Sequence, residues 1–375
     1  MPGLLPDVDP DGLLEYSVVF TDRSLNHMSQ SFQQVMNDIS STLKKVYCAT
    51  AIVMVPGGGT FSMEAVARQF GSGKKCLVIR NGWFSYRWTQ IFETGDIPSE
   101  SIVLKARPVD DSQHSAFAPA PIEEVVTTIQ TEQPDVVFAP HVETSSGMIL
   151  PDDYITAVAE AVHSVGGLFI LDCIASGAIW MDMETSAVDV LISAPQKGWS
   201  SSPCSGLVML SALARERIEA TTSTSFACDL LKWLQIMEAY ENGGHAYHAT
   251  MPTDALKGFR DVMKETEAYG FDKVRAKQQE LGNRVRDLLV NKGFQSVAAE
   301  GFQAPGVVVS YTDDIDIHKG AKFLQVGLQI AAGVPLQCDE PEGFQTFRLG
   351  LFGLDKLRHI DRTVEKLEQA LDRIL

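Results

Sequence analysis

Apolar residues recur in short, nearly continuous runs between about residues 40 and 205, and amphipathic stretches separate these runs. Strands that are covered on both faces have this kind of sequence, because neither side of the strand meets water. A stretch at residues 154–165 has the spacing of a helix. The alternation predicts a parallel sheet with crossover helices, whose ligands bind beyond the carboxyl ends of the strands. The runs lie at residues 51–55, 76–79, 136–139, 168–171 and 188–192.

The pattern changes after about residue 262, where longer helical stretches and isolated strands replace the regular alternation. The chain has 375 residues, which exceeds what one hydrophobic core usually serves. We therefore predict an α/β protein with an amino-terminal arm and large domain at residues 1–262 and a smaller α+β domain at residues 263–375. In the smaller domain we expect helices at 265–291 and 319–327, strands at 306–311 and around 347–349, and a final helix with an apolar face of Leu357, Ile360, Val364, Leu367, Leu371 and Ile374.

The net charge of −17 argues against nucleic acids and anionic membranes as partners, because the overall field repels both. No apolar run reaches the roughly 18 residues of a membrane span, and residues 1–7 lack a basic segment followed by an apolar stretch. We therefore expect a cytoplasmic protein. The six cysteines are scattered without metal-ligand spacing, so we expect reduced thiols and no metal site.

A carboxylate and an amine each follow an apolar run. Asp172 closes one run, and Lys197 follows the next run 25 residues later, in the tetrapeptide Pro195-Gln196-Lys197-Gly198. Most pyridoxal phosphate enzymes need this pair. The lysine holds the aldehyde of pyridoxal 5'-phosphate as a Schiff base, and the aspartate keeps the pyridine nitrogen protonated. We predict that Lys197 and Asp172 are the catalytic residues.

A glycine-rich segment at residues 56–60 directly follows an apolar run and opens a helical stretch. Glycines let backbone amides approach an anion closely, and the start of a helix favours negative charge. Gly58, Gly59 and Thr60 are therefore candidates for binding phosphate. The segment has neither the Lys-Ser/Thr pair of a P-loop nor the GxGxxG spacing of dinucleotide binders. A glycine-rich turn without a ligand is the other interpretation.

Two further segments follow apolar runs. Residues 81–88 are rich in aromatic side chains, one of which can stack on a flat heterocycle, although Trp83 and Trp88 fit the core better. In residues 141–147 the hydroxyls of Thr144 or Ser145 can bond a ring hydroxyl or a phosphate. His141 is interpreted as a structural residue.

These motifs, in this order, resemble the class V aminotransferases of the fold-type I pyridoxal phosphate enzymes, particularly the alanine/serine–glyoxylate aminotransferase group. The resemblance runs from about residue 26 to the carboxyl terminus. It implies a large domain with a mostly parallel sheet of the seven-stranded type. It also implies a transaminase that moves an amino group from a small amino acid to a 2-oxo acid such as glyoxylate or pyruvate. The motifs are GGGT, NGWF, HVETSSG, LDCIAS, SAPQKG, YHAT and FRLG.

The resemblance also implies individual roles. Phe84 falls where the family stacks an aromatic over the cofactor ring, and Gln196 matches a polar residue beside the cofactor. Ser145 or Thr144 serves the hydroxyl edge of the ring, and the resemblance does not choose between them. Arg348 matches the arginine that binds the substrate α-carboxylate, for which its planar fork is suited.

The resemblance further implies a homodimer with shared active sites. In residues 247–250, Tyr247 and Thr250 match residues that reach the phosphate of the neighbouring subunit's cofactor. Relatives usually begin with a Pro-Gly-Pro segment that lines the substrate pocket, whereas here residues 19–24 are Val-Phe-Thr-Asp-Arg-Ser. Arg23 in this segment is a candidate for binding a second anionic group of the substrate. A surface ion pair is the alternative role of Arg23.

A pyridoxal phosphate-dependent lyase or cysteine desulfurase is the alternative function. Desulfurase relatives carry His before the lysine and a mobile loop with a catalytic Cys, whereas here Gln196 precedes Lys197 and Cys338 is only a weak candidate. A non-catalytic scaffold or regulator is a third interpretation. Retention of both Lys197 and Asp172 argues against that interpretation.

Overall fold

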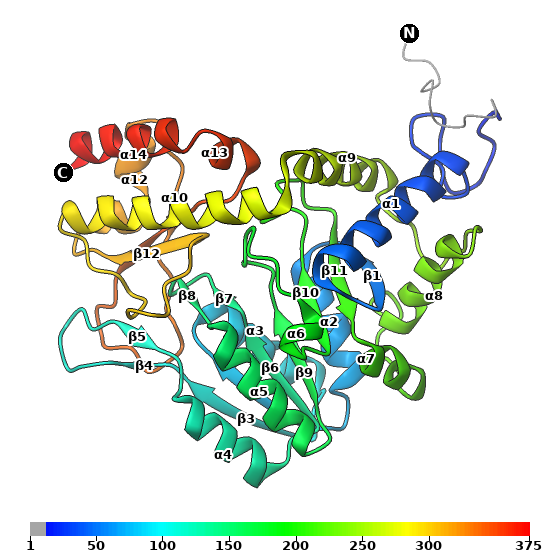
Figure 1. Ribbon diagram of the computed structural model, residues 1–375, viewed down its shortest axis with the longest axis horizontal. Helices are drawn as coiled ribbons and strands as arrows, with labels where there is room; N and C mark the ends of the chain where they lie inside the picture. The colour runs from blue at the N-terminus through cyan, green and yellow to red at the C-terminus, as the bar shows by residue number, and fades with distance from the viewer. Residues whose placement is uncertain (1–12) are drawn as a thin grey trace.

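Seven strands form the central sheet of the computed structural model, which describes residues 13–375 (Figure 1). The strand order is β1-β11-β10-β9-β6-β2-β3. Only β11 runs antiparallel to its neighbours, β1 and β10, and the other adjacent pairs are parallel. The predicted α/β class is thereby confirmed. The strands are β1 (Ala51–Pro56), β2 (Lys75–Arg80), β3 (Glu100–Lys105), β6 (Val136–Pro140), β9 (Leu168–Asp172), β10 (Val190–Ser193) and β11 (Ser205–Leu210).

Every predicted strand of this sheet is present, but the sequence pattern missed β3 and β11. β3 lies at the edge of the sheet, and its six residues are exposed or half-buried, so it lacks a continuous apolar run. β11 is buried throughout but begins with Ser205 and Gly206 after a Ser- and Pro-rich segment, which is typical of a loop.

Helices cover both faces of the sheet. α2 and α3 pack on one face, and α5, with α4 beside it, packs on the face toward the viewer in Figure 1. α1 begins at a serine cap, where Ser29 Oγ accepts a hydrogen bond from the Phe32 N–H. These helices are α1 (Gln30–Tyr47), α2 (Gly59–Phe70), α3 (Trp83–Gly95), α4 (Ile122–Glu132), α5 (Asp152–Ser164), α6 (Met183–Ser186), α7 (Ala212–Arg217), η1 (Ile218–Ala220) and α8 (Leu230–Glu241).

Two consecutive helices lead from the large sheet toward the carboxyl-terminal part of the chain. The predicted helix at 265–291 is interrupted, because α9 (Thr253–Tyr269) ends and α10 (Phe271–Asn291) begins at Gly270, which has φ of 100°. The domain boundary after residue 262 falls inside α9 and stays a prediction.

A second sheet has the order β12-β14-β13 and lies beneath α10 in Figure 1. The predicted helix at 319–327 is shorter than expected, because α12 (Ala321–Gln325) begins after Gly320, and the short helix α11 precedes that glycine. The predicted apolar face of the last helix is buried, but a break near His359 divides it into α13 and α14. These elements are β12 (Val307–Tyr311), β13 (Ala331–Ala332), β14 (Thr346–Gly350), α11 (Ile315–His318), α12 (Ala321–Gln325), α13 (Leu354–Arg358) and α14 (Ile360–Ile374).

Two short hairpins complete the secondary structure, β4 (Arg107–Pro108) with β5 (Phe117–Ala118) and β7 (Val142–Glu143) with β8 (Met148–Ile149). In residues 13–375, no helix combines the length and apolar character needed to cross a bilayer. The same residues contain no group of three or more His, Cys, Asp or Glu side chains that is arranged to hold a metal ion. The sequence inference about residues 1–7 lies outside the described residues.

Candidate active site

A cavity of about 200 Å³ lies beyond the carboxyl ends of the central strands. Asp172 ends β9 and is paired in register with Pro140 at the end of β6 and with Ile192 near the end of β10. The loops after these strands therefore meet at one edge of the sheet. The cavity is lined by Gly59, Thr60, Met63, Phe84, Arg87, Val142, Thr144, Asp172, Ile174, Ala175, Gln196 and Lys197.

Lys197 and Asp172 line this cavity together, as the sequence predicts. Burial lowers the pKa of Lys197, and the positive charges of Arg348 and Arg87 lower it further, against the opposing effect of Asp172. The Lys197 Nζ lies 5.2 Å from the ring centroid of Phe352. A lysine with a lowered pKa is more often a neutral amine, which is the form that attacks an aldehyde and removes protons.

Asp172 is buried, and its environment favours a cationic partner. Burial raises the pKa of Asp172 to about 7, and the nearby negative charge of Glu143 raises it as well. The hydrogen bond from the Ile174 N–H to Asp172 Oδ1, 2.9 Å long, opposes this rise. A protonated ring nitrogen placed beside Asp172 would supply the missing opposite charge.

The glycine-rich turn places the amino terminus of α2 at the cavity. Gly58 is the N-cap residue with extended backbone and has no side chain that could cap the helix, so the N–H groups of Gly59 and Thr60, which have no intrahelical partner, stay free within residues 13–375. Gly59 and Thr60 line the cavity, whereas Gly58 lies just outside the lining. Thr60 Oγ1 accepts a hydrogen bond of 3.0 Å from Arg87 Nη1. Free amides and a cation at one helix terminus are suited to an anion.

Phe84 lines the cavity from the first turn of α3. The guanidinium carbon of Arg87 lies 5.1 Å from the centroid of the Phe84 ring, and that of Arg348 lies 5.5 Å from it. Ile174, which follows Asp172 in the chain, is another apolar side chain of the lining. The cavity thus offers the apolar surface that a flat heterocycle needs.

Ser145 does not line the cavity. Its hydroxyl is completely buried, donates to Glu143 Oε1 at 2.7 Å and accepts the Trp83 N–H at 2.9 Å. Thr144 is half-buried and lines the cavity instead. Of the two hydroxyls that the sequence left open, the geometry therefore favours Thr144.

Glu143 holds the turn that carries Phe84, a role that the sequence did not indicate. Its buried carboxylate accepts five hydrogen bonds, from the N–H and hydroxyl groups of Ser85 and Ser145 and from the N–H of Phe84. Gly82 is required at the start of this turn, because a Cβ there would lie 2.0 Å from Ser145 Oγ and 2.7 Å from Glu143 Cγ. Glu143 thereby fixes the turn that carries Phe84.

Arg348 reaches the site from β14 of the second sheet. Its Nε donates to the carbonyl oxygen of Ala332 at 2.8 Å. Burial lowers the pKa of Arg348, and the negative charge of Glu143 opposes this effect. Arg348 remains charged, because the ordinary pKa of a guanidinium lies far above neutrality.

Three predicted site residues lie away from the cavity of their own chain. Tyr247 is 53% exposed, and its hydroxyl lies 3.1 Å from Thr250 Oγ1, which is also exposed. Arg23 is exposed and is not part of the lining.

His141 is buried with Nδ1 2.8 Å from Ser176 Oγ, and burial lowers its pKa to about 3, so it stays neutral.

The geometry adds Arg87, Ile174 and Phe352 to the site. Arg87 lies three residues after Phe84 on a helix, a spacing that places two side chains on the same face. Ile174 lies two residues after Asp172 in a motif that the sequence singled out. No signal in the sequence connects Phe352 to Lys197, because the two meet only through the tertiary fold.

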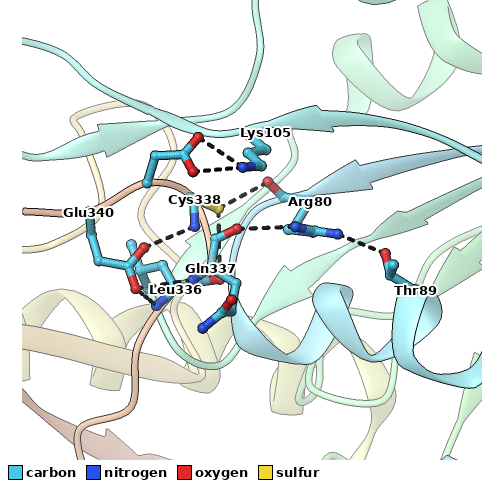
Figure 2. Close-up of polar contacts among 8 residues, drawn as sticks. Arg80, Thr89, Lys105, Leu336, Gln337, Cys338 and Glu340 are labelled. Atoms are coloured by element: carbon cyan, nitrogen blue, oxygen red, sulfur yellow. Dashed lines mark hydrogen bonds and ion pairs between the residues drawn. The ribbon is translucent and has the colours of Figure 1, made fainter. Parts of the chain in front are cut away.

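Cys338 lies in a loop that is held against the ends of β2 and β3 (Figure 2). Its Sγ lies 3.4 Å from the carbonyl oxygen of Arg80, and its N–H donates to Glu340 at 2.9 Å. Lys105 on β3 pairs with Asp339 of the same loop at 2.7 Å. Burial raises the pKa of the Cys338 thiol to about 12. A buried, protonated thiol in an anchored loop is not suited to nucleophilic attack.

The site fits pyridoxal phosphate on its own chemistry. Gln196 Oε1 is a buried acceptor that has no hydrogen-bond partner in the described part of the chain. Asp172 lacks a cationic partner within ion-pair distance there, although it lies beside Lys197 in the lining. A ligand with a protonated ring nitrogen and an anionic group would satisfy both the carboxylate and the exposed amides of α2.

Comparison with known proteins agrees with this geometry. Residues 13–345 match the family described as aminotransferase class-V. The chain is 24% identical to the alanine–glyoxylate aminotransferase of Felis catus, over 93% of this chain and 82% of that protein. It is 25% identical to the 2-aminoethylphosphonate–pyruvate transaminase of Syntrophobacter fumaroxidans, over 92% of this chain and 90% of that protein.

A crystal structure of the alanine–glyoxylate aminotransferase from Nostoc sp. superimposes with a TM-score of 0.77 at 21% identity. The superposition covers 93% of this chain and 89% of that structure. The likeness confirms the predicted fold, with its mostly parallel seven-stranded sheet. The chain therefore belongs to the class-V aminotransferase family and is a pyridoxal phosphate-dependent transaminase.

Proposed function

We propose that this transaminase moves the amino group of a small amino acid to a 2-oxo acid such as glyoxylate or pyruvate. The observation that carries the proposal is the meeting of Lys197, Asp172 and Phe84 in one cavity, with the Arg348 guanidinium 5.5 Å from the Phe84 ring. Relatives named as alanine–glyoxylate, aspartate–glyoxylate and 2-aminoethylphosphonate–pyruvate aminotransferases support this substrate class.

Each part of the cofactor has a proposed partner. Lys197 holds the aldehyde, Asp172 pairs with the ring nitrogen, and Phe84 and Ile174 contact the ring. Thr144 and Gln196 are suited to the polar edge of the ring. Gly59 and Thr60, at the start of α2, are suited to the phosphate. When bound, pyridoxal phosphate withdraws electrons from the α-carbon of the amino acid.

The protein residues orient the substrate and move its proton. Arg348 binds the α-carboxylate through its planar fork, which places the α-carbon next to the lysine. The lowered pKa of Lys197 keeps a fraction of its Nζ unprotonated, so that this nitrogen can accept the α-proton. Asp172 stabilises positive charge on the ring nitrogen throughout.

A screen of amino donors tests the proposal. Alanine, aspartate and 2-aminoethylphosphonate are each mixed with the holoenzyme, and the absorbance of the bound cofactor is followed before glyoxylate or pyruvate is added. We expect at least one donor to change the absorbance and one oxo acid to restore it. The same screen with Lys197→Ala, which lacks the amine, is the control. A protein that forms no amino product from any pair would contradict the proposal.

The desulfurase alternative is disfavoured by two observations. The Cys338 thiol is buried with a raised pKa, and the residue before Lys197 is Gln196 rather than His. Incubation with cysteine and an excess of a thiol reductant, which releases persulfide sulfur as sulfide, followed by a sulfide assay separates the two functions, since transamination does not break the C–S bond of cysteine. Sulfide at the rate of cofactor turnover would favour the lyase.

A homodimer with shared sites is part of the proposal. Tyr247 and Thr250 lie outside the cavity of their own chain, so a role at a cofactor phosphate requires a second copy. Phe61 in the first turn of α2 and Phe226 are also exposed, by 52% and 77%, and a second chain that covered them would remove this apolar surface from water. A strictly monomeric mass at working concentration would contradict this part.

We propose that Arg23 binds a second anionic group of the donor or acceptor. The support is its place in the segment that replaces the Pro-Gly-Pro turn of relatives. Comparing Arg23→Ala with the parent on alanine and on aspartate tests the role, because only aspartate carries a second carboxylate. Equal effects on both donors would remove Arg23 from the pocket. The cytoplasmic location inferred from the sequence stays a prediction.

A further inference from the structure

We infer that Arg87 is a direct ligand of the cofactor phosphate, acting together with Thr60. This inference rests on the proposed cofactor site and assigns a residue that the sequence motifs did not single out. Three observations carry it: the position of Arg87 in the cavity, the lack of a carboxylate partner, and the direction of its hydrogen bond to Thr60.

Arg87 connects the two parts of the cavity that a phosphorylated heterocycle would occupy. It lies on α3, three residues after Phe84, and its guanidinium carbon is 5.1 Å from the Phe84 ring. From there its Nη1 reaches Thr60 Oγ1 in the first turn of α2, at 3.0 Å. The guanidinium therefore lies between the aromatic platform and the free amides of a helix amino terminus.

Arg87 has no carboxylate within ion-pair distance anywhere in residues 13–375. Arg348, the other arginine beside the Phe84 ring, donates to the Ala332 carbonyl. The charge of Arg87 is also felt at the reactive groups, where it adds to the effect of burial and of Arg348 on the Lys197 amine. A cation that lines a cavity and has no carboxylate at ion-pair distance is suited to an anionic ligand.

The hydrogen bond between Arg87 and Thr60 has one possible direction. A guanidinium only donates, so Thr60 Oγ1 must accept, and the hydroxyl hydrogen of Thr60 remains available to another acceptor. Within the described chain no acceptor takes that hydrogen. Thr60 and Arg87 thus present an O–H, further guanidinium N–H groups and the α2 amides to one place, which matches the several acceptor oxygens of a phosphate.

The experiment compares a ligand that carries the phosphate with one that does not. Pyridoxal phosphate is removed from the holoenzyme, and the affinities for pyridoxal phosphate and for pyridoxal are measured by absorbance and by quenching of tryptophan fluorescence. The variants are Arg87→Ala, Arg87→Lys and Arg217→Ala. Arg217 lies outside the cavity and donates to the carbonyls of Gly166 and Gly167, so its removal controls for the loss of one positive charge.

We expect Arg87→Ala to weaken binding of pyridoxal phosphate by about 10- to 100-fold, as expected for the loss of hydrogen bonds to a charged group. Its affinity for pyridoxal should change less than twofold, and Arg87→Lys should recover part of the loss because the charge remains. Inorganic phosphate should compete with pyridoxal phosphate less well in Arg87→Ala than in the parent. Arg217→Ala should match the parent on both ligands.

Equal losses for pyridoxal phosphate and pyridoxal, or no loss for either, would overturn the assignment. If Arg87→Ala left the affinity for pyridoxal phosphate unchanged but lowered the affinity for the amino donor, Arg87 would be assigned to the substrate instead. That result would also overturn the assignment to the phosphate. Melting temperatures of the cofactor-free variants show whether the fold is intact, and a destabilised Arg87→Ala is replaced in the comparison by Arg87→Lys. Failure of the parent itself to bind pyridoxal phosphate would contradict the proposed function, which is a distinct outcome.

Discussion

Glu143 Oε1 accepts a hydrogen bond of 3.2 Å from the N–H of Phe84, a residue that lies on a different strand–helix connection. With the bonds from Ser85 and Ser145, this carboxylate satisfies the amino terminus of α3 in the way that a local N-cap residue normally does. The Phe84 ring is therefore held in position by the buried carboxylate of Glu143, which comes from the loop that follows β6.

Replacing Glu143 by Gln should reduce the free energy of unfolding by about 1–3 kcal/mol, because the amide NH₂ would face donors that the carboxylate now accepts. Cofactor affinity should fall as well, since the Phe84 turn loses its anchor. Chemical denaturation and cofactor titration measure the two effects. The control is Glu93→Gln, at an exposed position on α3, which should change neither the free energy of unfolding nor the cofactor affinity. If Glu143→Gln behaves like Glu93→Gln, the anchoring role is wrong.

Replacing Arg348 by Ala should lower kcat/KM for every α-amino acid donor, by the equivalent of about 2–5 kcal/mol. The reason is that the guanidinium binds the α-carboxylate, which all of these donors share. Steady-state kinetics with alanine and aspartate measure the effect. Arg358→Ala is a matched control, since Arg358 pairs with Glu265 outside the cavity. A loss confined to one donor would contradict the assignment of Arg348 to the α-carboxylate.

Mixing two inactive variants tests the shared site. A Lys197→Ala chain and a Thr250→Arg chain should together regain part of the parent activity, because one site of the mixed dimer contains neither change. Each variant alone, carried through the same unfolding and mixing procedure, is the control. Activity that stays at the level of the separate variants would mean that Thr250 does not serve a neighbouring subunit.

The pKa of Asp172 predicts a pH dependence of the cofactor-free protein. Its folded-state pKa of about 7 lies above its ordinary value near 4, so the folded state holds a proton that the unfolded state releases between these values. The contribution to stability is therefore present below pH 4 and is lost as the pH rises toward 7, by at most about 1.4 kcal/mol per pH unit.

Denaturation of the cofactor-free parent and of Asp172→Asn at pH 5 and pH 8 measures this contribution. The asparagine keeps the shape of the carboxyl group without its titration. The parent should lose stability relative to Asp172→Asn between the two pH values. A constant difference between them would show that Asp172 does not titrate in this range.

The sequence predicted those parts of the fold and the site whose signals are local. Strands β1, β2, β6, β9 and β10 are buried on both faces, so their apolar runs are continuous, whereas the edge strand β3 is not. Asp172 and Lys197 could be predicted because Asp172 closes such a run and Lys197 lies shortly after the next one. The choice between Thr144 and Ser145 required the structure, because adjacent residues in a turn point in different directions.

The roles of Glu143 and Arg87 also depend on the tertiary fold. Glu143 is a buried carboxylate whose hydrogen-bond partners come mainly from another loop, which no spacing rule connects to it. Arg87 has an ordinary place on an amphipathic helix, and only the tertiary structure shows that it lines the cavity beside Thr60. Residues that act through partners distant in sequence are therefore the ones that motif reasoning misses.

Borohydride reduction of the holoenzyme, followed by peptide mapping, tests the central claim most directly. The hydride fixes the covalent bond between the cofactor and the amine that holds it, so the labelled peptide identifies that amine. We expect a single label on Lys197 in the peptide that contains Gln196 and Gly198, and none in Lys197→Ala. A label on another lysine, or no label in a protein that has bound pyridoxal phosphate, would contradict it.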